Sequence, residues 1–248
     1  MEDLVSIVIP NRGGKNLDKV LQNIRFIYPE MNKEFIIVEQ ANRGPLQKGQ
    51  LFNIGVKMAN GKYLALSDHD ILHLRNVPWI QIYKSVKKPI IGFKYISQIV
   101  YVDGKPVITS TKDTPTGFGG FNFMERNDFI SFNGFSNLYF GWGYEDNAYG
   151  TRFEYVRIPQ NLGHITHPIS NRFDYPLNRE YNKALAKTET TRNKMEDGYL
   201  QTTFEVVSDE TKNDVRYIKV DNIWVCKNFK YMDILEEQIA LSNRIRIV

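Results

Sequence analysis

Two short segments carry carboxylates at positions that suit catalysis. Asp68 and Asp70 follow the apolar run at residues 63–66, and Glu145 and Asp146 follow a tryptophan flanked by glycines. Hard oxygen ligands suit a divalent cation that holds a diphosphate, and a further carboxylate can take the proton of an attacking hydroxyl. Together the two segments favour a glycosyltransferase that uses a nucleotide-sugar donor.

Each segment also has a simpler interpretation. An Asp-x-Asp after a strand is consistent with an ordinary polar turn. Glu145 and Asp146 in the first turn of a helix would be favourable charges at its N-terminus, whereas on an extended or turn backbone they would point in different directions and serve different functions. The helix interpretation leaves Gly141-Trp142-Gly143 unexplained, because a large aromatic there stands between two flexible residues.

A histidine pair strengthens the metal hypothesis. His164 and His167 lie three residues apart, so they can share one metal or supply one ligand and one supporting group. A solvated pair is the alternative, but the upstream carboxylates favour a ligand role. His69 and His73 are expected to be accessory or structural.

The first third of the chain alternates short apolar runs with helical periodicity. Strands are expected at residues 5–10, 35–39 and 63–66, with amphipathic helices at 16–26 and 48–58 between them. This order predicts a Rossmann-like βαβαβ unit with parallel strands.

Polar residues stand at the carboxyl ends of all three predicted strands. These are Pro10-Asn11-Arg12, Glu39-Gln40 and Asp68-His69-Asp70. Ligands of open parallel sheets bind beyond the carboxyl ends of the strands, so we expect the three clusters to converge at one edge.

The remaining pattern predicts shorter elements. We expect an extended segment at 90–108 with a hairpin turn at 102–105, a turn at 133–134, helices at 127–132 and 148–154, a strand at 156–159, a loop followed by a helix within 169–190, strands at 199–207 and 223–225, and a helix at 232–241.

Composition limits the class of protein. The 248 residues, 42% hydrophobic and 24% charged, suit one large α/β domain or a domain with a smaller lobe. A net charge of +4 without a basic run argues against nucleic acid and is compatible with a nucleotide diphosphate. Aromatics gather between Phe118 and Tyr155, which fits either a core or a sugar-binding cleft.

The expected location is the cytoplasm. The single cysteine, Cys226, excludes an intrachain disulfide and a cysteine-based zinc cluster, which fits a reducing compartment. The opening MEDLVSIVIP resembles neither a signal peptide nor a membrane anchor. Residues 231–248 fit either a packing helix or a peripheral contact with a membrane or partner.

The chain resembles the β-1,4-galactosyltransferase family, a metal-dependent inverting group with the GT-A fold. The matching stretches are VSIVIPNR, FIIVEQ, KGQLFNIG, LSDHD, FGGFNFMERNDFISFNGFSNLYFGWGYEDN, HITHPISNRFD and DGYLQTTFEV, in the family's order. The long glycine-aromatic block also resembles the GalNAc-transferring parts of polypeptide and chondroitin-type enzymes.

The resemblance implies roles for individual residues. Asp146 matches the catalytic base, with Glu145 beside it orienting the acceptor, and Trp142 matches the tryptophan of a small mobile loop. The implied Mn²⁺ ligands are Asp70, His164 and His167, and many members carry methionine at the position of His164. The implied donor or nucleotide contacts are Pro10, Arg12, Lys48 (an arginine in the family), Asp68, His69, Gly117, Gly120 and Trp142. Residues 169–187 correspond to the family's long lid.

Three departures concern the substrates. Asn147 replaces an aspartate that helps to hold the acceptor, and Tyr144 replaces a glycine, so the usual GlcNAc acceptor is in doubt. Tyr144, Glu145 and Asn147 are the expected acceptor contacts. Gly117 replaces a tyrosine near the 2-position of the donor, which leaves space for an N-acetyl group and suggests UDP-GalNAc.

The sequence therefore predicts an α/β protein of the GT-A class, with a mostly parallel central sheet, a catalytic domain at 1–207 and a C-terminal extension at 208–248. It would transfer galactose or N-acetylgalactosamine from a UDP-sugar to a saccharide or lipid-linked saccharide, in bacterial-style polysaccharide or glycoconjugate synthesis. The alternatives are another UDP-hexose transferase, for GlcNAc or glucuronic acid, and a non-catalytic carbohydrate-binding module.

Overall fold

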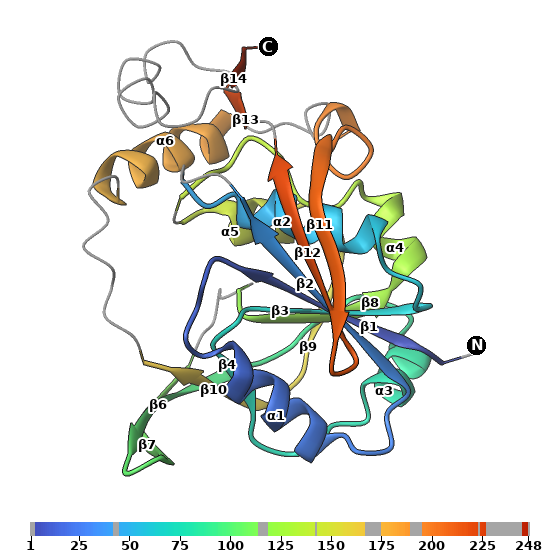
Figure 1. The fold of residues 1–248 in the computed structure, drawn as a ribbon, viewed down its shortest axis with the longest axis vertical. Coiled ribbons are helices and arrows are strands. Elements are labelled where there is room, and N and C mark those ends of the chain that lie inside the picture. The colour runs from blue at the N-terminus through green and yellow to red at the C-terminus, as the bar shows by residue number, and fades with distance from the viewer. Residues whose placement is uncertain are drawn as a thin grey trace.

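The computed structural model describes residues 3–41, 45–113, 119–141, 143–166, 175–188, 195–222, 224–226 and 245–247. Their elements form a central sheet with helices on both faces and a smaller sheet at one side (Figure 1). Helices α1 and α3 lie on one face of the central sheet, and α2, α4 and α5 lie on the other.

The predicted βαβαβ unit is confirmed. Its elements are β1 (Val5–Asn11), α1 (Leu17–Ile27), β2 (Lys33–Gln40), α2 (Lys48–Lys57) and β3 (Tyr63–Ser67). The three strands are parallel in the order β2-β1-β3, and β1 and β3 are buried along their whole length. Burial on both faces explains why these strands read as continuous apolar runs in the sequence.

The central sheet has eight strands in the order β11-β12-β2-β1-β3-β8-β5-β9. The added strands are β8 (Phe121–Glu125), β5 (Ile90–Ile91), β9 (Val156–Arg157), β11 (Phe204–Lys212) and β12 (Val215–Asn222). Strands β8 and β11 run antiparallel to their neighbours, so the sheet is mixed around a parallel centre. The predicted strand at 156–159 is therefore shorter than expected.

The smaller sheet has the order β4-β10-β6-β7. Its strands are β4 (Ile71–His73), β10 (Asn161–Ile165), β6 (Tyr95–Val102) and β7 (Lys105–Asp113). The hairpin turn predicted at 102–105 is confirmed, with Asp103 at φ 49° and Gly104 at φ 75°. Strand β10 was not predicted, and it places His164 inside a sheet.

The remaining helices are α3 (Trp79–Val86), α4 (Arg126–Ser131), α5 (Glu145–Gly150) and α6 (Tyr175–Thr188). The helix predicted at 127–132 is confirmed as α4. The helix predicted at 148–154 was wrong in its bounds, because the chain becomes helical at Glu145, directly after a residue with left-handed backbone. Of the predicted lid at 169–187, residues 175–187 belong to α6, and 169–174 lie outside the described part.

The predicted division after residue 207 is corrected by the sheet pairing. The strand expected at 199–207 begins at Phe204 and runs to Lys212, so the boundary falls inside β11. Its hairpin partner β12 pairs in parallel with β2, from Val215 to Val220. The central sheet therefore includes residues as far along the chain as Asn222, beyond the predicted boundary.

Beyond the central sheet, two short strands are described, β13 (Trp224–Cys226) and β14 (Ile245–Ile247), which pair in parallel. The helix expected at 232–241 lies outside the described residues, as does most of the segment 231–248. In the part of the chain that the structure describes, no helix combines the length and apolarity needed to span a bilayer.

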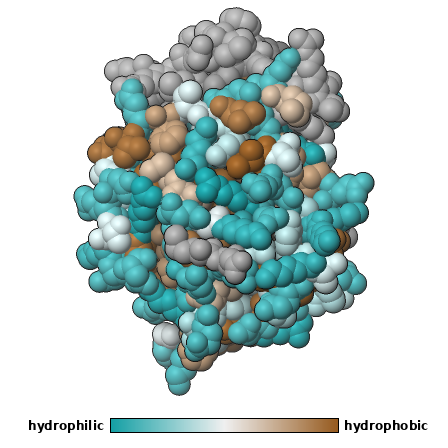
Figure 2. All heavy atoms as spheres, turned by 90° about the vertical axis from the view of Figure 1, so that its right-hand side faces the viewer, coloured by the Kyte–Doolittle hydropathy of each residue, from teal (hydrophilic) through white to brown (hydrophobic). Residues whose placement is uncertain are grey.

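Within the part of the chain that the structure describes, most aromatic side chains are buried. Phe135 stacks on Tyr149 with their ring centroids 3.7 Å apart, and Phe129 is fully buried beside both. Trp79, Phe121 and His73 pack together beneath the central sheet. The face seen in Figure 2 is mainly hydrophilic with scattered apolar areas, consistent with aromatics gathered inside.

Candidate active site

The polar clusters predicted at the strand ends do meet at one edge. Asn11 at the end of β1 pairs in register with Glu39 on β2, and the loop after β3 carries Asp68, His69 and Asp70. The peptide N–H of Asp68 donates to the carbonyl of Gly120, which leads into β8. The carboxyl edge of the parallel strands therefore collects the candidate residues.

Lys48 lies at the centre of a cluster of carboxylates. Its Nζ is 2.8 Å from Asp146 Oδ2, 3.1 Å from Glu145 Oε1 and 3.5 Å from Asp68 Oδ2. Lys48 is the first residue of α2, and its side chain is only 14% exposed. Two segments separated by some eighty residues in the sequence thus meet around one ammonium group.

Burial and charge act against each other in this cluster. Burial by itself would lower the pKa of Lys48, but Asp146, Asp68 and Glu145 together raise the pKa of Lys48 well above its usual value. Burial raises the pKa of Asp146, and the Lys48 ammonium opposes that rise. Asp146 is therefore a stronger proton acceptor than an exposed aspartate while a cation beside it favours its ionised form.

The local backbone brings both acidic residues to the cluster. Tyr144 has φ 69°, a left-handed conformation that turns the chain abruptly into α5, so Glu145 and Asp146 occupy its first turn. The helix-terminus interpretation therefore describes their backbone. These residues are more than charges at a helix terminus, because Glu145 is 11% exposed and its Oε2 is buried with no hydrogen-bond partner within the described residues. Such a group is expected where a ligand completes the site.

Gly119 provides the space that Asp146 needs. A Cβ atom at Gly119 would overlap Asp146 Oδ2, so any larger residue would displace the carboxylate. Gly14 similarly allows the ring of His69 to approach the loop after β1.

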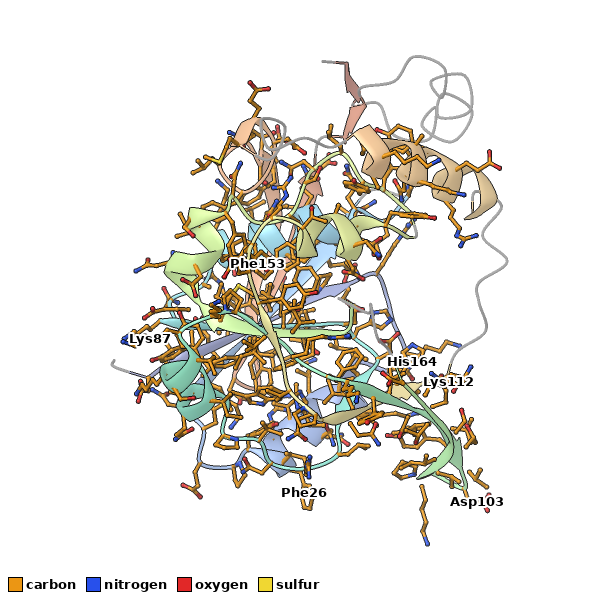
Figure 3. All side chains as sticks on the ribbon, turned by 180° about the vertical axis from the view of Figure 1, so that it is seen from behind. Phe26, Lys87, Asp103, Lys112, Phe153 and His164 are labelled. Atoms are coloured by element: carbon orange, nitrogen blue, oxygen red, sulfur yellow. The ribbon has the colours of Figure 1, made fainter. Side chains whose placement is uncertain are left out.

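A second pair of candidate residues faces each other beside this cluster. Asp70 is 6% exposed, and its Oδ2 lies 3.6 Å from His164 Nε2. The contact with Asp70 raises the pKa of His164, against the opposing effect of burial. Figure 3 labels His164 on β10, beside the β6–β7 hairpin.

These residues fit a divalent cation. Within the described ranges no group of three potential ligands is assembled, and the third predicted ligand, His167, lies outside them. Asp70 and His164 nevertheless bring one carboxylate oxygen and one imidazole nitrogen within 3.6 Å of each other, and such a donor set suits manganese. Lys48 contributes one positive charge beside the three carboxylates of Asp68, Glu145 and Asp146, so the site attracts cations.

The arrangement of elements matches known glycosyltransferases. Crystal structures of Drosophila β-1,4-galactosyltransferase 7 align over 89% of this chain and 94% of theirs. One is a point variant with manganese, UDP-Gal and xylobiose, with a TM-score of 0.65 and 16% identity. The other is the catalytic domain with xylobiose, with a TM-score of 0.63 and 18% identity. The fold is GT-A.

Sequence comparisons agree with this GT-A assignment. A family model described as the N-terminal domain of galactosyltransferase matches residues 109–168. Bovine β-1,4-galactosyltransferase 3 is 22% identical over 83% of this chain and 52% of its own length. A β-1,4-N-acetylglucosaminyltransferase of the snail Lymnaea stagnalis is 30% identical over 62% of this chain and 31% of its own.

The predicted resemblance to β-1,4-galactosyltransferases is thus confirmed. The chain spans about half the length, or less, of the curated relatives that it matches. The family model over residues 109–168 covers the glycine-aromatic block, and within its range lie Glu145, Asp146 and His164.

The other predicted site residues take the following places. Pro10 lies on β1 and Arg12 just beyond it, and Gly120 adopts φ 96° before β8. Asn147 is exposed on α5, beside Tyr144. Gly117, Trp142 and His167 lie outside the described residues, so their predicted roles remain predictions.

Asn182 on α6 was not predicted to contribute to the site. It is fully buried, and its Nδ2 donates to the carbonyl of Phe140 at 2.9 Å and to that of Gly143 at 2.8 Å. The side chain thereby holds both ends of the segment that leads into α5. Nothing in the linear sequence distinguishes this asparagine from the many other polar residues of the segment 169–190.

Proposed function

We propose that this GT-A protein is a metal-dependent inverting glycosyltransferase that moves galactose or N-acetylgalactosamine from a UDP-sugar to a sugar hydroxyl. The observation that carries the proposal is the buried carboxylate cluster around Lys48, next to Asp70 and His164. Glu145, Asp146 and His164 lie within the segment that matches the galactosyltransferase model. The curated relatives and the Drosophila structures have activities and ligands of this class.

Asp146 is the proposed base. The acceptor oxygen attacks the anomeric carbon of the donor as the bond from that carbon to the UDP oxygen breaks, and the electron pair leaves with UDP. Asp146 takes the proton of the acceptor hydroxyl, and its buried position suits it to that task. Attack from the face opposite UDP inverts the configuration of the sugar.

The leaving group is held by the other half of the site. Asp70, His164 and His167 would hold Mn²⁺, which supplies charge stabilisation to the departing diphosphate. Asp68 and Lys48, with Pro10, Arg12, His69 and Gly120, are the proposed contacts of the nucleotide. Glu145 orients the acceptor beside the base.

The first test separates binding from catalysis. Asp146→Asn should lower transfer, measured as UDP release, by at least about 100-fold, since general-base catalysis contributes about 10²–10⁴-fold. Calorimetry should find UDP and Mn²⁺ binding nearly unchanged. Glu154→Gln, an exposed change beyond α5, is the matched control and should leave both intact. If Asp146→Asn instead lost nucleotide binding and kept its rate of transfer, the assignment of Asp146 as the base would be wrong.

The donor is the next question. We propose UDP-GalNAc as an accepted donor, because Gly117 is expected to leave space for an N-acetyl group. Turnover with UDP-Gal and UDP-GalNAc compares them directly, and a strong preference for UDP-Gal would exclude the GalNAc proposal. The Lymnaea relative makes UDP-GlcNAc a second candidate that the same screen includes.

The acceptor is proposed to differ from GlcNAc, because Asn147 and Tyr144 alter the predicted acceptor contacts. A saccharide array, including lipid-linked acceptors, tests this. The cytoplasmic location, the peripheral membrane contact and the bacterial polysaccharide role stay proposals of the same kind, and the relatives named above are animal proteins. A thermal shift with UDP and Mn²⁺ separates an enzyme from a module that binds only carbohydrate.

A further inference from the structure

The smaller sheet aligns three polar residues from neighbouring strands. Asp70 directly precedes β4, whose first residue, Ile71, pairs with His164 on β10. On the other side of β10, His164 pairs in parallel register with Gln98 on β6. The N–H of Ile165 also donates to the carbonyl of Asp70 at 2.8 Å. Backbone pairing therefore sets Asp70, His164 and Gln98 side by side.

The two nitrogens of the His164 ring face different partners. Nε2 lies 3.6 Å from Asp70 Oδ2, and Nδ1 lies 3.1 Å from Gln98 Oε1. The hydroxyl of Thr166 donates to the same Gln98 oxygen at 3.4 Å. Because that oxygen accepts, the hydrogen between it and the ring belongs to Nδ1 of His164. The lone pair of the neutral ring is then on Nε2, toward Asp70.

Gln98 is itself held in place by the β6–β7 hairpin. The register of the hairpin shifts between Gln98 and Ile99, and the Thr109 hydroxyl donates to the Gln98 carbonyl at 3.3 Å. Irregularities of this kind re-aim a side chain, and they recur next to active sites.

We propose that Gln98 is a positioning residue that fixes His164 as its Nδ1–H form, so that Nε2 joins Asp70 in binding the divalent cation. This inference rests on the metal-dependent function proposed above and adds the residue that prepares the ligand. A metal-bound histidine is usually oriented by a hydrogen bond from its other nitrogen, and removal of that partner commonly costs about 10- to 100-fold in metal affinity.

An ion pair between a protonated His164 and Asp70 would make the same contacts with no metal role. The two interpretations differ in what depends on Gln98. A ligand role makes Mn²⁺ affinity sensitive to the acceptor at position 98, whereas an ion pair does not.

The test measures Mn²⁺ binding to the full chain in the presence of UDP, by electron paramagnetic resonance of the free ion. Gln98→Met removes the acceptor at similar size and should weaken Mn²⁺ binding by about 10-fold or more. Gln98→Glu keeps an acceptor and should bind within a few-fold of the parent. Val107→Thr, an exposed change on the same hairpin, is the matched control and should bind as the parent does.

The outcomes separate the two levels of the proposal. If Gln98→Met binds Mn²⁺ as tightly as the parent, or if Gln98→Met and Gln98→Glu lose Mn²⁺ affinity equally, the role of Gln98 is overturned and the proposed function is unaffected. No Mn²⁺ binding by the parent would overturn both. Should Gln98→Met not fold, ¹⁵N spectra of the histidines in the parent decide: a hydrogen on Nε2 of neutral His164 refutes the inference, and one on Nδ1 supports it.

Discussion

Replacing Lys48 by methionine should destabilise the protein in a way that depends on pH. The ammonium of Lys48 lies within 3.5 Å of Asp68, Glu145 and Asp146, and all four side chains are largely buried. Methionine keeps most of the side-chain volume and removes the charge. The variant therefore leaves a group of carboxylates close together without their cation.

The expected loss is large for a single side chain. Breaking a buried ion pair by removing one partner costs about 3–5 kcal/mol, because the remaining charge stays desolvated and unpaired. We expect a loss of this size in the free energy of unfolding at pH 8, where the carboxylates are ionised in the unfolded chain. Lys48 is charged in both states at that pH, since its pKa is raised further by folding.

The sign of the pH dependence follows from the carboxylates. Burial already raises the pKa of Asp68, of Glu145 and of Asp146, and removing Lys48 raises all three further. As the pH falls, these carboxylates bind protons in the folded variant and lose their unfavourable charges. The gap between parent and Lys48→Met should therefore be widest at pH 8 and narrow toward pH 5.

Urea unfolding followed by circular dichroism at pH 8 and pH 5 measures this gap. Lys48→Arg keeps the charge and should lose much less stability. Lys88→Met is the matched control, because Lys88 forms an exposed pair with Glu154 at 2.7 Å and such pairs contribute about 0–1 kcal/mol. A loss below about 1 kcal/mol for Lys48→Met, or an equal loss at both pH values, would refute this account of the cluster.

Three further predictions concern single positions. Gly119→Ala should lower turnover about 100-fold with UDP binding retained, because the new Cβ displaces Asp146 and such misplacement is costly; unchanged turnover argues against that contact. Asn182→Asp loses both hydrogen bonds that the amide group donates, and it should lower turnover about 10- to 100-fold with little change in UDP affinity. Lys183→Ala, on the exposed side of α6, is the control; an equal loss of turnover in this variant would contradict the role of the Asn182 hydrogen bonds. Burial lowers the pKa of His73 to about 3, so only the unfolded chain binds its proton between about pH 6.5 and 3. Urea unfolding measures the difference in free energy of unfolding between the parent and His73→Gln. The advantage of the parent should shrink by about 1.4 kcal/mol per pH unit as the pH falls below 6.5, and a constant difference from pH 7 to 5 would contradict this prediction.

Local pattern in the sequence was enough to predict the parallel half of the fold. The β-branched runs at β1 and β2 can be buried only between layers of helices, and the helical periodicity between them leaves one topology for the connections. The placement of Asp68 and Asp70 followed, because residues after parallel strands share one edge of the sheet. The contact of Asp68 with Lys48 was not predictable in this way.

Tertiary structure decided how the site is assembled. Lys48 and Asp146 are 98 positions apart, and their contact depends on how α2 and α5 pack, which the periodicity of neither helix encodes. Strand β10 is short and lies between β4 and β6, far from both in sequence, so its register and the contact of His164 with Gln98 arise only in the folded sheet. The sequence by itself determined the kinds of residue available for the chemistry and the strand ends that carry Asp68 and Asp70. The fold decided which of these residues form ion pairs and hydrogen bonds with one another, because such interactions act over a few ångströms between residues that are far apart along the chain.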